Sequence, residues 1–151
     1  MGHPIINDIS TDRAQPPVFL TSPPKDGRYD AASLVGPTEQ AYGDLVNLHV
    51  TQEPEAVFLR VRHLVEQRQW QVTAVEAERW RIQAVATTRF LRFKDDVVIQ
   101  VRTENGEKNR GEQDQGGSVV VMRSKSRLGK GDLGTNAKRI RAFLNDLSQF
   151  L

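Results

Sequence analysis

The sequence predicts an α+β fold: a two-layer sandwich in which two helices cover one face of an antiparallel sheet of about five strands. Short segments with alternating apolar and polar residues predict half-buried strands. Two longer segments, about 52–69 and 135–150, repeat apolar residues at helical spacing. The last four strand segments follow one another without a helix between them, and strands joined by short turns pair antiparallel. The expected order is therefore β-α-β-β-β-β-α.

The first 44 residues differ in composition from the rest, being rich in Pro, Asp, Ser and Thr. Paired prolines and turn-forming side chains oppose regular helix or sheet. Scattered apolar residues, among them Ile9 and Phe19, indicate that this segment packs on the domain, with complete disorder as the alternative. We therefore divide the chain into an irregular Pro-rich arm, 1–44, and a single α+β domain, 45–151.

A strand and a helix open the domain. Residues 45–50 alternate as a half-buried strand does. In the helix that follows, about 52–69, Thr51 is the expected N-cap, and Pro54 suits the first turn because that turn leaves its N–H groups unbonded. The closing helix is expected to bury four apolar residues, Ile140, Phe143, Leu144 and Leu147.

Four further strands are expected between the two helices. They begin near Trp70, Trp80, Val97 and Ser118. The second is long, 80–93, and its alternation shifts near Thr88–Phe90, which predicts a β-bulge. Asp95 and Asp96 fall in the turn after it. The polar, glycine-containing segment 103–117 predicts a long hairpin loop.

Length and composition narrow the class of protein. A chain of 151 residues fits one domain with a sizeable core. Cysteine is absent, which excludes disulfides and thiolate metal sites, and the three histidines lack ligand spacing, so no metal or other cofactor is predicted. No transmembrane run or signal peptide is visible, so we expect a soluble chain that could lie against a membrane. The net charge of +2 and the lack of a recognition motif disfavour nucleic acid as a partner.

The run 123–136 joins the last strand to the closing helix through cations, hydroxyls and glycines. A helix N-terminus offers free N–H groups and a partial positive charge, so this junction is a candidate anion site. The candidate binding residues are Arg123, Ser124, Ser126, Arg127, Lys130, Asn136 and Arg139. The alternative is structural: Asp132 or Thr135 caps the helix, and the arginines pair with Asp95, Asp96 or the arm. The G-x-G-x-x-G pattern in this run does not indicate a dinucleotide site, because the expected sheet is not parallel.

Three blocks of this sequence are familiar: NDISTD with PPVF, TTRFLRFKDDVVI, and RSKSRLG with DLGTN and RIR. Together they resemble the DUF1499 family of uncharacterised proteins over nearly the whole chain. The resemblance marks Arg89, Asp95, Asp96 and Asp132 as motif positions that support the candidate site. It implies no particular activity, although some members carry transmembrane helices or an export signal before this domain. Gln100 stands where the family pattern leads us to expect a basic residue.

Three functions are compatible with these features. The first is a non-enzymatic binding module for a small anionic or amphipathic, lipid-like ligand, or for an anionic membrane surface. The second is a structural or interaction domain in which the Arg/Asp motif forms an internal ion-pair network. The third is a hydrolase-type enzyme using Asp95, Asp96 and the 123–136 loop, but adjacent strand residues point to opposite faces of a sheet. We therefore expect the binding module and assign no catalytic residue.

Overall fold

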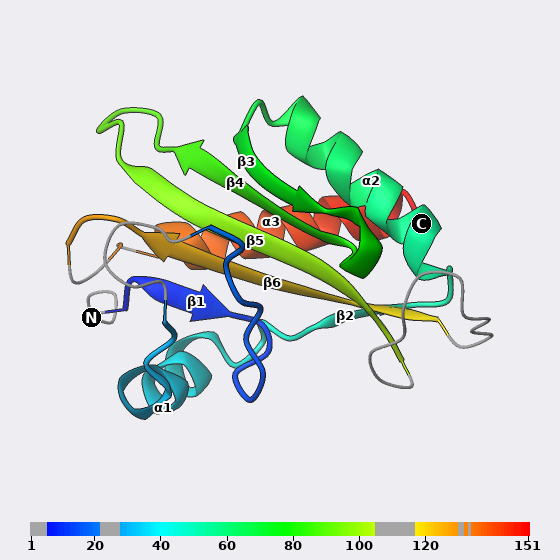
Figure 1. Ribbon diagram of the computed structural model, residues 1–151. Helices are drawn as coiled ribbons and strands as arrows, with labels where there is room; N and C mark the ends of the chain where they lie inside the picture. The colour runs from blue at the N-terminus through cyan, green and yellow to red at the C-terminus, as the bar shows by residue number, and fades with distance from the viewer. Residues whose placement is uncertain (1–5, 22–27, 105–116, 130–131, 133) are drawn as a thin grey trace.

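The computed structural model describes residues 6–21, 28–104, 117–129, 132 and 134–151. These form an open antiparallel sheet of six strands with three α-helices, which confirms the predicted α+β class (Figure 1). The strands are β1 (Asp8–Ser10), β2 (Leu48–Val50), β3 (Gln71–Glu76), β4 (Arg81–Thr87), β5 (Lys94–Thr103) and β6 (Ser118–Ser126). The helices are α1 (Ala31–Tyr42), α2 (Pro54–Gln67) and α3 (Thr135–Gln149), with a 3₁₀ turn at Ala77–Arg79. The spatial order is β1-β6-β5-β4-β3, and β2 also pairs with β6.

Helices α2 and α3 lie on one face of the sheet and bury their apolar stripes against it. Ile140, Phe143, Leu144 and Leu147 of α3 are buried as predicted. Helix α2 begins at Pro54 and not near 52, so Pro54 lies in the first turn as predicted, but Glu53 and not Thr51 is the N-cap residue. In the described part of the chain, every helix is too short or too polar to cross a bilayer.

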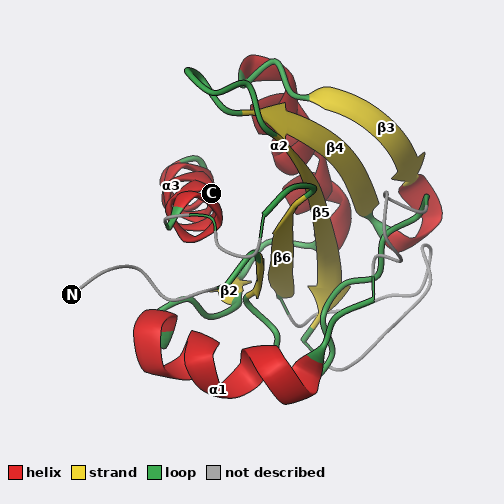
Figure 2. Cartoon of the chain, turned by 90° about the vertical axis from the view of Figure 1, so that its left-hand side faces the viewer, coloured by secondary structure: helices red, strands yellow, loops and turns green. Residues whose placement is uncertain are grey.

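The arm is less irregular than its composition indicated. Strand β1 pairs antiparallel with β6, and residues 31–42 form a helix although Pro37 lies inside it. Asp30 is the N-cap of this helix, and its carboxylate accepts a hydrogen bond from the Ser33 N–H at 3.4 Å. Figure 2 shows α1 apart from α2, and Figure 1 shows it beside β1, the strand at one end of the sheet order. The described residues therefore contain six strands and three α-helices, where five strands and two helices were expected.

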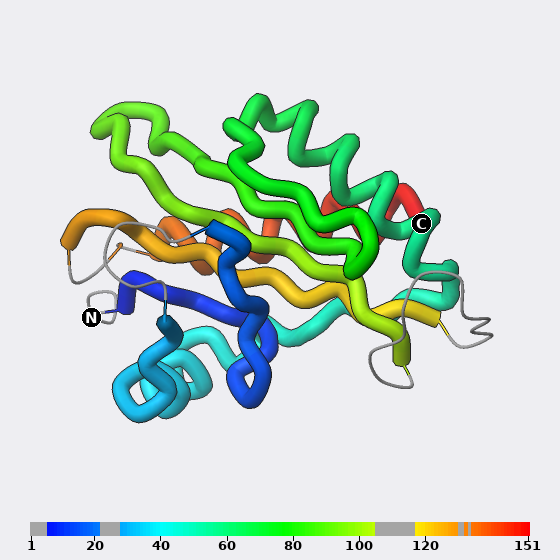
Figure 3. Tube along the Cα trace, in the orientation of Figure 1, coloured from blue at the N-terminus to red at the C-terminus, as the bar shows by residue number. Residues whose placement is uncertain are grey.

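Residues 11–21 of the arm cross the face of the sheet opposite to α2 and α3 (Figure 3). Gln83 in β4 holds this segment, because its Oε1 accepts hydrogen bonds from the Leu20 and Thr21 N–H groups at 2.7 and 3.0 Å. Arg102 in β5 adds an ion pair of 3.2 Å with Asp12. The sheet is thus covered on both faces, by helices on one and by the arm on the other.

The long strand predicted for 80–93 is wrong in its second half. Strand β4 ends at Thr87, and residues 88–93 form a tight turn closed by the Thr88 N–H and the Phe93 carbonyl at 2.7 Å. The break in alternation marked this turn, whereas the bulge lies in β3, between Val72 and Ala74.

Strand β5 starts at Lys94, so Asp95 and Asp96 are strand residues and not a turn. Most of the loop predicted at 103–117 falls outside the described residues.

Candidate functional site

Asp95 and Asp96 point to opposite faces of the sheet, as predicted for neighbours in a strand. Asp96 lies on the arm face, where its two carboxylate oxygens accept hydrogen bonds from Nε and Nη2 of Arg127, both at 2.9 Å. Asp95 lies on the helix face, where its Oδ2 is 2.8 Å from Nη1 of Arg139. Both carboxylates are buried. The two acids therefore cannot act at one centre.

Arg123, one of the predicted anion ligands, is buried in the arm face and does not pair with either of these acids. Its Nε and Nη2 donate hydrogen bonds to the two oxygens of Asp8 at 2.9 and 2.8 Å. Its guanidinium also lies 4.6 Å from the ring centroid of Phe19. Arg123 thus joins β6 to the arm.

Arg127 is likewise paired within the chain, through its two hydrogen bonds to Asp96. These hydrogen bonds raise the pKa of its guanidinium above its ordinary value.

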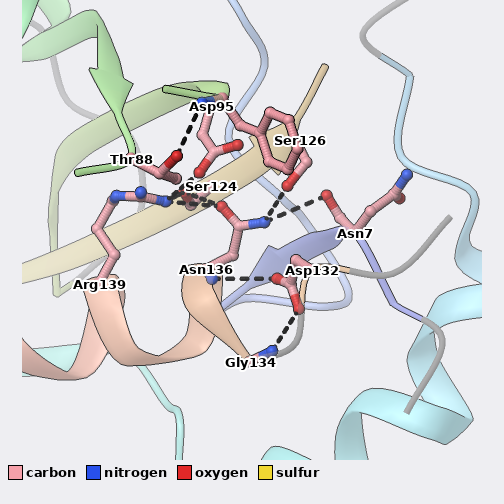
Figure 4. Close-up of polar contacts among 10 residues, drawn as sticks. Asn7, Thr88, Asp95, Ser124, Ser126, Asp132, Gly134, Asn136 and Arg139 are labelled. Atoms are coloured by element: carbon pink, nitrogen blue, oxygen red, sulfur yellow. Dashed lines mark hydrogen bonds and ion pairs between the residues drawn. The ribbon is translucent and has the colours of Figure 1, made fainter. Parts of the chain in front are cut away.

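Four of the other predicted residues do come together on the helix face, around Asn136 (Figure 4). The Asn136 amide oxygen accepts hydrogen bonds from Ser124 Oγ at 2.5 Å and from Arg139 Nη1 at 2.9 Å. Its amide nitrogen donates to Ser126 Oγ at 2.8 Å. Arg139 Nη1 also donates to Ser124 Oγ at 3.1 Å. This cluster links the end of β6 to the first turn of α3.

The start of α3 is capped from within the chain. The two carboxylate oxygens of Asp132 accept hydrogen bonds from the backbone N–H groups of Gly134 and Asn136, at 2.8 and 3.1 Å. Gly134 has a φ of 80°, a conformation that glycine adopts without strain. The N–H groups that could have faced an anion are therefore partly occupied, as the structural alternative predicted. Lys130 lies outside the described residues.

A pocket of about 600 Å³ opens beside this cluster, between the 88–93 turn, the end of β6 and the start of α3. Its least exposed wall is polar, with Asp95 buried and Ser126 and Arg139 half-buried, and we call this wall the base of the pocket. Its mouth is largely apolar and includes four exposed side chains: Phe90 at 90%, Leu91 at 68%, Phe93 at 46% and Leu128 at 63%. The pocket thus changes from apolar at the surface to polar at its base.

At the base of the pocket, the surroundings of the Asp95 carboxyl disfavour its charged form. Burial raises the pKa of its carboxyl above the ordinary value of 3.8, against the lowering effect of Arg139 and of a hydrogen bond with Ser126. Its Oδ2 lies 2.8 Å from Nη1 of Arg139, a contact that lowers the pKa although its geometry is poor for a hydrogen bond. Arg139 approaches it, but Nη1 donates to Ser124 and Asn136, so the contact with Asp95 is ionic. A buried acceptor with an ionic partner but no well-aligned hydrogen bond thus lies at the base of the pocket.

Reasoning from the sequence missed the mouth of the pocket. Phe90, Leu91 and Phe93 were assigned to a strand, and Leu128 to a loop chosen for its cations. The signal was the broken alternation near Thr88, because a turn exposes residues that a continued strand would bury. Arg89, a motif position of the family resemblance, lines the pocket and is exposed at this mouth.

Metal chemistry receives no support from the described residues, where no group of three His, Asp or Glu side chains could hold an ion. His49 lies away from the pocket, with its Nδ1 3.1 Å from Glu104 Oε1 at an exposed position.

The fold and the pocket define an α+β domain with an open antiparallel sheet, two helices on one face and a candidate ligand site where β4 and β5 meet α3. The chain belongs to the family described as protein of unknown function (DUF1499), whose model matches residues 8–147. This match confirms the resemblance and extends from β1 through most of α3. No curated protein matches the sequence.

Proposed function

We propose that this domain is a binding module for an amphipathic molecule, held with its apolar part at the mouth of the pocket and its polar head near Asp95. The observation that carries the proposal is the pocket itself, with exposed apolar side chains outside and buried polar groups inside. Its volume of about 600 Å³ is typical of sites for small molecules. Each methylene group withdrawn from water contributes about 0.8 kcal/mol, so a short alkyl chain supplies substantial affinity.

The polar head is best supplied by a hydrogen-bond donor. Asp95 Oδ2 is a buried acceptor that Arg139 contacts ionically at 2.8 Å without a well-aligned hydrogen bond, so a further donor at this carboxylate would stabilise it. A hydroxyl, amide or ammonium group would satisfy this oxygen. An anionic head would meet the carboxylates of Asp95 and Asp132, while Arg139 is already engaged. These contacts favour the amphipathic ligand over the purely anionic ligand that we also expected.

The two alternative functions receive different support. The hydrolase reading needs Asp95 and Asp96 at one centre, but they face opposite sides and Arg127 occupies both oxygens of Asp96. The contacts of Arg123 and Arg127 fit an internal ion-pair network, because each guanidinium donates two hydrogen bonds to a buried carboxylate. These two pairs lie on the arm face, and the Asp95–Arg139 pair on the helix face does not account for the apolar mouth of the pocket.

A displacement assay tests the proposal. The purified chain would be titrated with N-phenyl-1-naphthylamine, a neutral fluorophore that brightens in apolar sites. Alkyl alcohols, amines, carboxylates and phosphates of one chain length would then compete with it. We expect the fluorophore to bind, and the alcohol and amine to displace it at lower concentration than the phosphate.

The matched variants are Asp95→Asn and Asp44→Asn, since Asp44 is an exposed acid that pairs with Arg141 and lies outside the pocket lining. Asp95→Asn should weaken the amine about tenfold, because a hydrogen bond to a charged acceptor is roughly twice as strong as a neutral one. Asp44→Asn should leave every affinity unchanged. Absence of fluorophore binding, or equal affinities in both variants, would overturn the proposal, and a preference for the phosphate would favour the anion site.

A further inference from the structure

An exposed surface lies around the mouth of the pocket, and we call it the tip surface: Arg89, Phe90, Leu91, Arg92, Lys94 and Leu128. Phe90 is 90% exposed, Leu91 68% and Leu128 63%. Figure 1 shows the β4–β5 turn and the segment after β6 at the same end of the molecule, and the three apolar residues line one pocket. Neighbouring exposed apolar groups of this kind mark interaction surfaces.

The turn that carries this surface has a defined backbone. Besides the Thr88–Phe93 backbone hydrogen bond, Thr88 Oγ1 accepts a hydrogen bond from the Phe93 N–H at 2.8 Å. Arg92 adopts a φ of 58°, which is uncommon for a residue with a side chain. A constrained turn therefore holds Phe90 and Leu91 at positions exposed to water.

The charges beside these residues identify the partner. The segment 88–94 contains Arg89, Arg92 and Lys94 and no acidic residue. Among the described residues, none forms an ion pair with these three cations, whereas Arg123, Arg127 and Arg139 each contact a carboxylate. Two apolar side chains between two arginines suit the interface of a bilayer, where apolar groups enter the acyl boundary and cations meet anionic headgroups.

We propose that Phe90, Leu91 and Leu128 insert into the interface of a bilayer containing anionic lipids, with Arg89, Arg92 and Lys94 among the headgroups. The pocket mouth would then face the acyl layer, and the amphipathic ligand could pass between bilayer and pocket without crossing water. The ligand transfer rests on the proposed function. The docking rests only on the tip surface.

Vesicle sedimentation tests the docking. The chain would be mixed with sucrose-loaded vesicles of phosphatidylcholine, with and without phosphatidylglycerol, and the bound fraction measured. We expect binding that requires phosphatidylglycerol and falls as salt is added, because salt screens exposed charges. Arg92→Gln/Lys94→Gln should weaken it about 30-fold, from about fivefold for each cation near the surface. Phe90→Ser/Leu91→Ser should weaken it about 100-fold, from the apolar area kept out of water.

The matched control is Val46→Ser/Leu59→Ser, which removes two other exposed apolar side chains, at 56% and 59% exposure, and should bind vesicles as the unaltered chain does. Equal sedimentation of this variant and Phe90→Ser/Leu91→Ser would overturn the docking, as would equal binding to both vesicle types. Self-association of the chain without vesicles, abolished by Phe90→Ser/Leu91→Ser, would assign the tip surface to a second copy and likewise overturn it.

Two variants separate this inference from the proposed function. Asp95→Asn alters the buried base of the pocket and should reduce fluorophore displacement by the amine while leaving vesicle binding intact. Arg92→Gln/Lys94→Gln alters residues outside the pocket lining and should do the reverse. If both variants keep vesicle binding, the docking fails alone, and if neither changes amine displacement, the assigned head-group site fails alone.

Discussion

Asp95 and Asp96 are adjacent in one strand, equally buried, and differ in how their charge is satisfied. Asp96 receives two hydrogen bonds from Arg127, in the planar geometry that matches a guanidinium to a carboxylate. Asp95 has an ionic contact with Arg139 and an oxygen without a hydrogen bond. A satisfied buried charge fixes structure, whereas a half-satisfied one costs stability and is available to a ligand.

The comparison extends to the two faces of the sheet. On the arm face, polar side chains are paired within the chain: Arg123 with Asp8, Arg102 with Asp12, and Gln83 with the backbone of the arm. On the helix face, the apolar core gives way at one end to the pocket and Asp95. We therefore expect substitutions on the arm face to alter stability, and substitutions at the pocket to alter binding.

The largest expected effect is from Arg123→Met. The change leaves Asp8 buried without its partner, and breaking a buried ion pair costs about 3–5 kcal/mol. The free energy of unfolding from urea titrations measures it. The double variant Asp8→Asn/Arg123→Met should recover part of the loss, because no uncompensated charge remains. A loss below about 1 kcal/mol, the size of an exposed pair, would contradict the structural role.

Arg127→Gln should have the next largest effect. Asp96 would lose both hydrogen bonds, but the Arg127 side chain is 27% exposed, so water can reach part of the gap. We expect a loss of about 2–3 kcal/mol, near the cost of an unsatisfied buried group. Arg141→Gln serves as the control, because its pair with Asp44 is exposed on both sides. Equal losses in the two variants would show that burial of Asp96 does not decide the effect.

Asp95→Asn should cost less than Arg127→Gln, under about 2 kcal/mol at neutral pH, and its effect should depend on pH in one direction. Because the folded pKa of Asp95 is raised above 3.8, its contribution to stability is fully present below that pH. It is lost as pH rises through the folded pKa. The asparagine variant has no such loss, so its stability relative to the unaltered chain should improve from acid to neutral pH.

Urea titrations of both proteins from acid to neutral pH measure the difference between their free energies of unfolding. The contributions of the other carboxyl groups are nearly the same in both proteins, so they largely cancel in this difference. An asparagine variant that becomes relatively less stable toward neutral pH would mean that Arg139 satisfies Asp95 fully. The contrast with Asp96 would then disappear.

Periodicity was sufficient to predict the parts of the fold in which apolar residues recur. Phe143 and Leu147 follow the helical spacing that buries them, and the strand order follows from the short connections. The arm was harder to predict, because β1 has three residues and owes its pairing to β6, far along the chain. Helix α1 contains Pro37, which local propensity counts against a helix.

The sequence was sufficient to predict several residues of the candidate site, but not which side chains pair with one another. Asn136, Ser124, Ser126 and Arg139 were named from one loop and do form one cluster. Arg123 was named with them but faces the other side of the sheet, because neighbouring strand residues alternate. Its partner Asp8 comes from the opposite end of the sequence, which spacing along the chain cannot reveal. The pocket required the 88–93 turn to be recognised as a turn.

The smallest expected effect on stability is from Phe90→Ser. A side chain that is 90% exposed makes few contacts to lose, so the free energy of unfolding should change by less than about 0.5 kcal/mol. Phe143→Ala is the matched comparison, since that ring is fully buried against Trp70 and its loss should cost about 3–5 kcal/mol. A large loss from Phe90→Ser in urea titrations would show that this ring supports the fold. If the stability is unchanged, Phe90 resembles Asp95: each occupies a position that folding alone does not favour, and both line the same pocket.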